Sequence, residues 1–262
     1  MSDWLPGTAV ITGGASGIGF ALAQRLTALG TKVMIADLSG ATLDRAAAEI
    51  GAFAHECDVC DSEAVAALVV DAFERLGHVD LLLNNAGRSG PSGKPLWEIS
   101  FEEAQAHFEV NFWGVWRGCA AFAPRMIASE RTCAIFNTAS ENSFFCAMPR
   151  MAAYVAAKHA VLGMTENLRE DLPPRVHAGV IVPGWVYTGI GPADVMRHGM
   201  GVGEYADIAL PQILARRRFV VSHRSNLKRI DERMDELRAS YAEFTSDDDK
   251  DVRDTVARLR EG

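Results

Sequence analysis

The stretch TAVITGGASGIG, residues 8–19, decides the fold of this chain. Its apolar beginning breaks into glycines, and a helical apolar pattern starts at Ile18, so the stretch predicts a strand, a turn and a helix. Gly13, Gly17 and Gly19 lie in the turn, where missing side chains let the backbone approach a pyrophosphate and the helix N-terminus faces its charge. Their spacing, Gly-x-x-x-Gly-x-Gly, differs from the common Gly-x-Gly-x-x-Gly fingerprint, so the turn alone is a weak indication of a dinucleotide site.

The rest of the chain repeats this alternation of strand and helix. The expected strands are near-continuous apolar runs, which is typical of a parallel sheet covered by helices on both faces, and right-handed crossovers then give a doubly wound fold. We therefore expect one Rossmann-type α/β domain over residues 1–223, with about seven strands, and a charged, helical C-terminal extension over residues 224–262. Further strands are expected at residues 32–36, 52–55, 79–83, 133–137, 176–182 and 219–221, and helices at 41–50, 62–76, 101–129 and 152–172.

Two later segments depart from this alternation. Residues 189–218 are rich in glycine and methionine, and no long helix or regular strand is expected there to pack their apolar side chains. We therefore expect a lid that closes over a substrate. The acidic run at residues 247–251 is expected to be a solvated stretch rather than a binding motif.

The composition narrows the possible partners and compartments. The 262 residues carry a formal net charge of −8, which argues against a nucleic acid or an anionic membrane as partner, because either would demand a basic face. No apolar run is long enough to span a membrane and the first residues lack the features of a signal peptide, so we expect a cytoplasmic protein. The five cysteines do not indicate a disulfide framework, and Cys57 and Cys60 have no second ligand pair, so we expect no metal site.

Tyr154 and Lys158 are the candidate proton-transfer pair. Residues four apart share one face of a helix, so the ammonium can lie close to the phenol. A phenol titrates near pH ~10, and a neighbouring cation lowers that pKa towards the range in which general acid–base catalysis is efficient. Tyr-x-x-x-Lys is also frequent on ordinary helices, so the pair gains its meaning from Ser140 upstream and from the glycine turn.

Asp37 is the candidate for cofactor selection. It ends the second expected strand, 18 positions after Gly19, where an acid binds the adenosine ribose hydroxyls of a dinucleotide. A carboxylate there repels a 2′-phosphate, and its neighbours Ala36 and Leu38 offer no cation to accept one. These residues favour NAD over NADP. The alternative is that Asp37 caps the helix expected from Ala41.

Together these motifs resemble the short-chain dehydrogenase/reductase family, specifically its short branch of about 250 residues. The resemblance runs from Thr8 to about Val221. The matching pieces are the glycine turn of residues 12–19, Asp58-Val59, the Asn-Asn-Ala-Gly run of residues 84–87, Asn111, Ser140, Tyr154 with Lys158, and residues 183–188.

The resemblance implies a role for each matching residue. Tyr154 would be the acid/base, Ser140 would position the reacting oxygen, Lys158 would anchor the ribose and modify the Tyr154 pKa, and Asn111 would support a water relay. Asp58 and Val59 would hold the adenine, and residues 182–184 would back the nicotinamide. The cofactor-binding set would comprise Gly13, Ser16, Gly17, Ile18, Gly19, Asp37, Asp58, Val59, Asn85, Ala86, Gly87, Tyr154, Lys158, Pro183, Gly184, Val186 and Thr188, with Asn84 beside it.

Several of these residues also have ordinary structural roles open to them. Ser140 could cap a strand end, Asn84 and Asn85 could form a turn, and Asn111 could be a satisfied helix amide. Ser140 also lies 14 positions before Tyr154, one more than the family pattern implies, which leaves Ser143 as an alternative.

The function expected from the sequence is hydride transfer between NAD and a secondary alcohol or ketone. Large apolar residues in the loops expected near the nicotinamide indicate a bulky aromatic or alicyclic substrate, although several could be core residues. An epimerase or dehydratase of related fold and a non-catalytic nucleotide-sensing scaffold are the alternatives. The apolar residues concerned are Phe144, Phe145, Met148, Met151, Trp185, Tyr187, Met196 and Met200.

The chain is also expected to form a homo-oligomer. The helices at residues 101–129 and 152–172 are apolar on almost every side, and one face against a sheet cannot bury the rest. Pairing across a two-fold axis would bury them, as the family resemblance also implies, so we expect a dimer or a tetramer.

Overall fold

A computed structural model describes residues 4–38, 40–89, 93–188, 193–244 and 251–261. These residues fall into two compact units, residues 1–223 and residues 224–262. The first unit carries every motif identified in the sequence, and the second contains only helices among its described residues.

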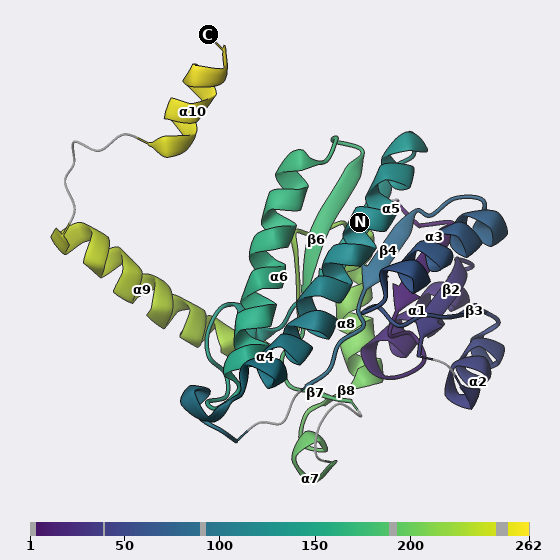
Figure 1. Cartoon of the computed structure of the whole chain (residues 1–262), viewed down its shortest axis with the longest axis horizontal. Helices are drawn as coiled ribbons and strands as arrows, with labels where there is room; N and C mark the ends of the chain where they lie inside the picture. Colours follow the sequence, from purple (N-terminus) through teal and green to yellow (C-terminus); the bar gives the residue numbers. More distant parts are fainter. Residues whose placement is uncertain (1–3, 39, 90–92, 189–192, 245–250, 262) are drawn as a thin grey trace. The chain divides into compact units, whose positions relative to one another are not determined.

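A seven-stranded sheet forms the centre of the first unit (Figure 1). Every pair of neighbouring strands is parallel, and the order β3-β2-β1-β4-β5-β6-β9 is that of a doubly wound fold, so the predicted fold class is confirmed. The strands are β1 (Thr8–Thr12), β2 (Lys32–Asp37), β3 (Phe53–Glu56), β4 (Leu81–Asn84), β5 (Cys133–Thr138), β6 (Val176–Val182) and β9 (Phe219–Val221).

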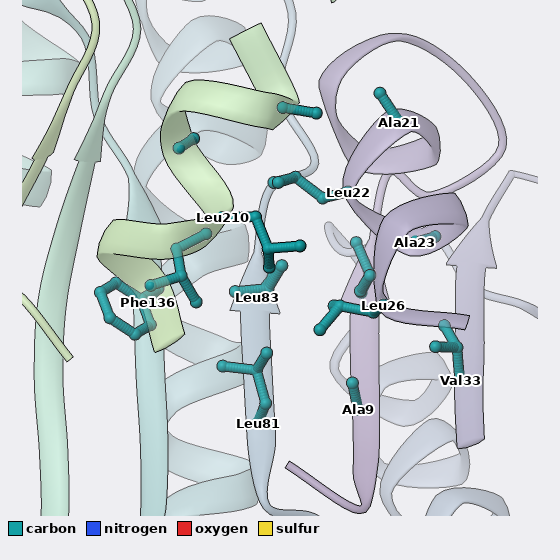
Figure 2. Close-up of a cluster of buried hydrophobic side chains, with 14 of the residues drawn as sticks. Ala9, Ala21, Leu22, Ala23, Leu26, Val33, Leu81, Leu83, Phe136 and Leu210 are labelled. Carbon is teal, nitrogen blue, oxygen red and sulfur yellow. The ribbon is translucent and has the colours of Figure 1, made fainter. Parts of the chain in front are cut away.

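Helices cover both faces of this sheet. Along β1, Ala9 and Ile11 join one buried cluster and Val10 joins the other, because successive side chains of a strand point to opposite faces. The first face is covered by α1 (Gly17–Ala28), α2 (Ala41–Ile50) and α8 (Val202–Leu214), and the second by α3 (Ser62–Leu76), α5 (Gly114–Ala128) and α6 (Ala152–Asp171). Figure 2 shows Leu22, Leu26 and Leu210 gathered over Leu83 and Phe136 on the first face.

The helix expected over residues 101–129 is interrupted by a wider turn. It consists of α4 (Phe101–Phe108), a π-helical segment (Glu109–Trp113) and α5. A π turn inserts an extra residue into the helical ladder and often marks a functional site. Asn111 lies in this segment and is fully buried.

The sequence predicts no long helix in residues 189–218 that could pack their apolar side chains, and this expectation is wrong. Helix α8 buries Tyr205, Ala206, Ala209, Leu210 and Ile213 against α1 and the sheet, so it belongs to the packed body of the unit rather than to a lid. Before it, strands β7 (Val186–Tyr187) and β8 (Met200–Gly201) pair in parallel, and α7 spans Ala193–Met196. Residues 189–192 lie outside the described part of the chain.

The second unit contains two charged helices. They are α9 (Leu227–Phe244), which follows a short 3-10 turn at Arg224–Asn226, and α10 (Val252–Glu261). Most of the acidic run at residues 247–251 lies outside the described residues. Across the described ranges of both units, no helix is long and apolar enough to cross a membrane.

A buried polar network joins the ends of β4 and β5 to the helices above them. Asn84 Nδ2 donates to Asn137 Oδ1 at 2.8 Å, and Asn137 Nδ2 donates to Thr165 Oγ1 of α6 at 2.9 Å. Gly118 of α5 faces this network, and a Cβ atom added there would lie 2.1 Å from Asn84 Oδ1. The absence of a side chain at Gly118 is therefore what lets α5 lie against the end of β4.

We expect Gly118→Ala to lower the free energy of unfolding by about 1–3 kcal/mol, because the methyl group would push on a buried amide. Gly201→Ala is the matched control, since a Cβ atom at Gly201 meets nothing within 4 Å. Urea unfolding followed by circular dichroism measures both. Equal stability of the two variants would contradict this account of Gly118.

Candidate active site

The glycine turn forms an open cradle at the start of α1. Gly13 and Gly17 adopt positive φ angles of 64° and 56°, which favour glycine. A Cβ atom at Gly19 would lie 2.2 Å from the Gly13 carbonyl oxygen, so this position excludes any side chain. Ser16 is exposed at the helix N-cap with no side-chain cap bond, and Ile18 is half-buried beside it. A helix N-terminus with these bare amides fits the pyrophosphate of a dinucleotide.

A second loop closes against this cradle. Thr12 Oγ1 accepts hydrogen bonds from the amides of Asn85 at 3.0 Å and Ala86 at 3.1 Å. The Asn85 side chain donates to the Thr12 and Gly13 carbonyl oxygens, both at 3.1 Å. The loop after β4 is thus fixed beside the glycine turn, because parallel strands bring their carboxyl ends to one edge of the sheet.

Asp37 connects the end of β2 to the glycine turn. Its carboxylate accepts from the Ala15 amide at 3.0 Å and from the Leu38 amide at 2.8 Å. Gly40, not Asp37, is the N-cap of α2, so the helix-capping alternative is wrong. The acid therefore stands at the edge of the cradle, where ribose hydroxyls would meet it.

The two residues expected at the adenine lie beyond the end of the neighbouring strand β3. Asp58 is exposed, and its Oδ1 accepts from the Cys60 amide at 2.9 Å. Val59 is buried, and a Cβ atom at Gly114 would meet its Cγ2 at 2.7 Å. Val59 is therefore clamped between the sheet edge and α5, with Asp58 facing solvent.

Lys158 is a buried cation whose ammonium contacts the end of β5. Its Nζ donates to the Thr138 carbonyl oxygen at 2.8 Å, and the residue is 3% exposed. Burial disfavours the charged form and lowers the pKa of Lys158 to about 8. The ammonium lies 5.8 Å from the centre of the Tyr154 ring.

The Tyr154 hydroxyl is hydrogen-bonded to Ser140. Burial raises the Tyr154 pKa above its ordinary value, the bond with Ser140 lowers it, and the negative charge of Glu141 raises it. The lowered pKa expected from Lys158 is therefore not found in this structure. The physical reason is that burial opposes the phenolate, while the ammonium is held on the Thr138 carbonyl.

Ser140, rather than Ser143, is the serine beside the phenol. The Ser140 hydroxyl also accepts from the Asn142 amide at 3.2 Å, so the residue caps a short 3-10 turn (Glu141–Ser143) as well. The Ser143 hydroxyl donates to the Lys158 carbonyl oxygen at 2.6 Å and is committed to the start of α6.

Asn111 is a satisfied amide that lies beside Lys158. Its Oδ1 accepts from the Arg88 amide at 3.1 Å, and its Nδ2 donates to the carbonyl oxygens of Arg88 at 2.9 Å and His107 at 3.2 Å. A Cβ atom at Gly87 would lie 2.9 Å from Asn111 Oδ1 and 3.6 Å from Lys158 Nζ. The structure thus brings Gly87, Asn111 and Lys158 together.

The loop after β6 completes the cleft opposite α6. The Pro183 carbonyl oxygen accepts from the Glu141 amide at 2.9 Å, which joins this loop to the Ser140 turn. A Cβ atom at Gly184 would lie 2.4 Å from His223 Nδ1. Val186 and Thr188 are buried, and Thr188 faces the position where a Gly17 side chain would begin.

Some residues of this site were not assigned from the sequence. Thr12, Thr138 and Glu141 hold or perturb the assigned residues, and nothing in their residue types signals these roles. A crevice beside Tyr154 is lined by Ile99, His107 and Met151 among others. The side chain of Phe144 packs on Phe219 with ring centres 5.9 Å apart, so the alternative of a core residue holds for it.

Comparison with known proteins agrees with this geometry. A family model described as short chain dehydrogenase matches residues 7–195. The chain belongs to the short-chain dehydrogenase/reductase family. It is 41% identical over 189 residues to 1-deoxy-11-beta-hydroxypentalenate dehydrogenase of Streptomyces avermitilis, covering 70% of each chain. It is 34% identical over 191 residues to 2,5-dichloro-2,5-cyclohexadiene-1,4-diol dehydrogenase of Sphingobium indicum, covering 72% of this chain and 76% of that one.

A solved member of the family shows the same fold over nearly the whole chain. The crystal structure of a short-chain dehydrogenase/reductase from Burkholderia phymatum in complex with NAD has a TM-score of 0.85 and 31% identity, covering 92% of this chain and 97% of that one. The protein is therefore an oxidoreductase of this family, which uses a nicotinamide cofactor.

The cysteines lie apart from this chemistry. All five are within the described residues and are free thiols. Burial and, to a smaller extent, the charge of Asp58 raise the pKa of Cys57 to about 11. Burial and a hydrogen bond with Asp58 raise the pKa of Cys60 to about 11 as well. Within the described ranges, no cluster of His, Cys, Asp and Glu could hold a metal ion.

We expect Lys158→Met to raise the free energy of unfolding at pH 7 by about 1–3 kcal/mol, because it removes a buried charge at the loss of one hydrogen bond. The pKa of about 8 in the folded protein lies below the ordinary lysine value of 10.5. Between these two pKa values the unfolded chain binds more protons than the folded chain, so the wild type becomes more stable as pH rises. The difference in free energy of unfolding between Lys158→Met and wild type should therefore shrink above pH ~8.

Chemical denaturation from neutral to alkaline pH measures this effect. Lys32→Met is the control, because Lys32 is exposed at the start of β2 and its replacement removes no buried charge. A Lys158→Met variant that is less stable than wild type at every pH would contradict the expectation.

Proposed function

We propose that this protein is a NAD-dependent dehydrogenase that oxidises a secondary alcohol on a bulky, mainly apolar ring system, or reduces the matching ketone. The observation that carries the proposal is the buried Lys158 ammonium, which lies 5.8 Å from the centre of the Tyr154 ring, with Ser140 acting on the phenol from beyond the end of β5. These residues supply a proton acceptor, a second hydrogen-bond partner for the reacting oxygen and a nearby positive charge.

In the oxidising direction, Tyr154 removes the hydroxyl proton of the substrate. The Ser140 hydroxyl donates to the same oxygen as it becomes a carbonyl. When Tyr154 is a phenolate, its negative charge favours the ammonium form of Lys158, and the ammonium in turn favours the phenolate. A bound nicotinamide supplies the hydride chemistry. The glycine cradle and the 183–188 loop would hold it between β1 and β6.

The proposed site residues follow the sequence assignment. Acid–base chemistry is assigned to Tyr154, Ser140 and Lys158, while Asn111, which binds the backbone of Arg88, would support a water relay. The adenosine end is assigned to Asp37, Asp58 and Val59. The choice of NAD rests on Asp37, because its carboxylate stands at the cradle edge and would repel a 2′-phosphate.

The substrate class is supported by exposed apolar residues near the cleft. A groove next to the start of α6 includes Leu96, Trp97 and Met151 among its lining residues, and Trp97 is 82% exposed. Trp185 and Tyr187 are exposed on the loop after β6. Exposed apolar side chains of this kind suit a large ring system. The names of the two curated relatives, a hydroxypentalenate and a cyclohexadiene-diol dehydrogenase, point to the same class.

We also propose a homo-oligomer in a reducing compartment. Trp113, at the end of the π-helical segment, and Trp116 of α5 are 42% and 48% exposed, and their rings pack edge to face. Burial of these two rings against a second copy would suit a homo-oligomer. The five free thiols suit the cytoplasm.

A screen of aromatic, alicyclic, steroid and sugar alcohols tests the function, with reduction of NAD followed by absorbance. We expect turnover with ring-bearing secondary alcohols, and we expect Tyr154→Phe to lose at least ~10²-fold in kcat while NAD affinity stays nearly unchanged. Tyr205→Phe is the matched control, because the Tyr205 hydroxyl is buried without a hydrogen-bond partner. NAD binding without turnover of any alcohol or ketone would favour the nucleotide-sensing alternative.

Asp37→Asn should narrow the preference for NAD over NADP by roughly tenfold or more, because it removes the negative charge and keeps an acceptor for the Ala15 amide. Asp37→Ala should narrow it too, with an added loss of stability from the two unpaired amides. The ratio of kcat/KM for the two cofactors measures the effect. Equal use of NAD and NADP by the wild type would refute the role of Asp37.

A further inference from the structure

Helix α9 carries an apolar stripe with the spacing of a coiled coil. Along the helix, apolar residues recur at alternating intervals of three and four, which is the a/d pattern of a heptad repeat. The six seam residues are Leu227, Ile230, Met234, Leu237, Tyr241 and Phe244. Charged and small residues occupy the remaining positions, so the pattern is that of a single narrow seam.

This seam lies at the surface of its unit. No residue of α9 is buried, and Leu237, Tyr241 and Phe244 are 48%, 63% and 77% exposed. An isolated helix of 18 residues is only marginally stable in water. Exposed ion pairs such as Arg238–Asp235 add little to its stability. A helix of this kind derives its stability from packing of its apolar face against a partner.

We propose that the seam of α9 pairs antiparallel with α9 of a second copy of this chain. In an antiparallel pair, each a position packs against a d position of the partner. Leu227 would then meet the partner subunit's Phe244, Ile230 the partner subunit's Tyr241, and Met234 the partner subunit's Leu237, with the two-fold axis between residues 235 and 236. All six seam residues of each copy are covered in this register, so the surface is self-complementary.

The charges beside the seam determine the orientation. With Leu227 at position a, Asp231 and Arg238 fall at e positions and Arg233 falls at a g position. The antiparallel register places Asp231 opposite the partner subunit's Arg238, twice by symmetry. A parallel register would instead place Arg233 opposite the partner subunit's Arg238, which is repulsive. The sequence of α9 therefore favours the antiparallel arrangement.

The proposed homo-oligomer also brings a second copy of α9 close enough to act as this partner. The seam of α9 spans only two and a half heptads, which is short for a pair formed from free helices. Where the first units associate, as proposed above, two copies of α9 are tethered at a high effective concentration, and a weak helix pair becomes populated. The seam would then add an interface to the oligomer that the first unit does not contain.

Intermolecular distances between spin labels test the pairing in the full chain. Glu236→Cys and Glu243→Cys place labels at the same heptad position, seven residues apart, in a background in which Cys60 and Cys146 are replaced by serine. An antiparallel pair brings the two 236 labels close together and separates the two 243 labels by about 20 Å more along the axis. A parallel pair gives equal distances. Equal distances, or no defined distance at either site, would overturn the proposal.

Charge reversal gives a second test, measured by the same spin-label distances. Arg238→Asp should weaken the α9 pair about tenfold, because it creates two like-charge contacts, and Asp231→Arg combined with Arg238→Asp should restore it. Arg229→Asp is the matched control, since Arg229 also has an ion pair three residues along the helix, with Glu232, but lies off the seam. The spin-label distances report the pairing of α9 itself, even where the first units alone hold the copies together. Unchanged or strengthened pairing in Arg238→Asp would contradict the antiparallel seam.

Discussion

The burial of one ammonium group, that of Lys158, is the constraint on which the active-site architecture depends. A cation inside a protein is stable only where the chain offers it oxygen acceptors, and here the Thr138 carbonyl at the end of β5 provides one. This contact fixes α6 against the sheet edge at the point where Tyr154 faces Ser140. Because burial already disfavours the charge, a neighbouring phenolate is the group that relieves it. The cost in stability and the capacity for acid–base chemistry therefore have the same physical origin.

The remainder of the site is held by loops that follow parallel strands. The carboxyl ends of β1, β4, β5 and β6 meet at one edge, so short connections from distant parts of the chain contact each other there. Thr12 holds the loop after β4, Asn111 holds the backbone that follows Gly87, and Pro183 accepts from the turn after Ser140. In each of these contacts a backbone amide is the donor, so the loops are positioned through their main chain.

The two units of the chain differ in how they obtain their stability. The first has large apolar clusters on both faces of its sheet, so its helices are held by tertiary packing. Helix α9 buries none of its residues within its own chain and carries its apolar side chains in a single stripe. The first unit is therefore specified by intramolecular burial, whereas α9 presents its apolar stripe for the pairing proposed above.

The sequence by itself determined the fold class, and it predicted which residues form the site. The apolar strands predicted the parallel sheet, with the bounds of 41–50, 62–76 and 176–182 reproduced by α2, α3 and β6, because strongly periodic segments encode their own secondary structure. Tertiary structure alone decided the rest. Residues 202–214 became a packed helix rather than part of a lid because α1 offers them an apolar surface, and the Tyr154 pKa rose because burial outweighs a lysine that is already bonded to Thr138. Such outcomes depend on which distant groups come into contact, and a linear pattern does not contain that information.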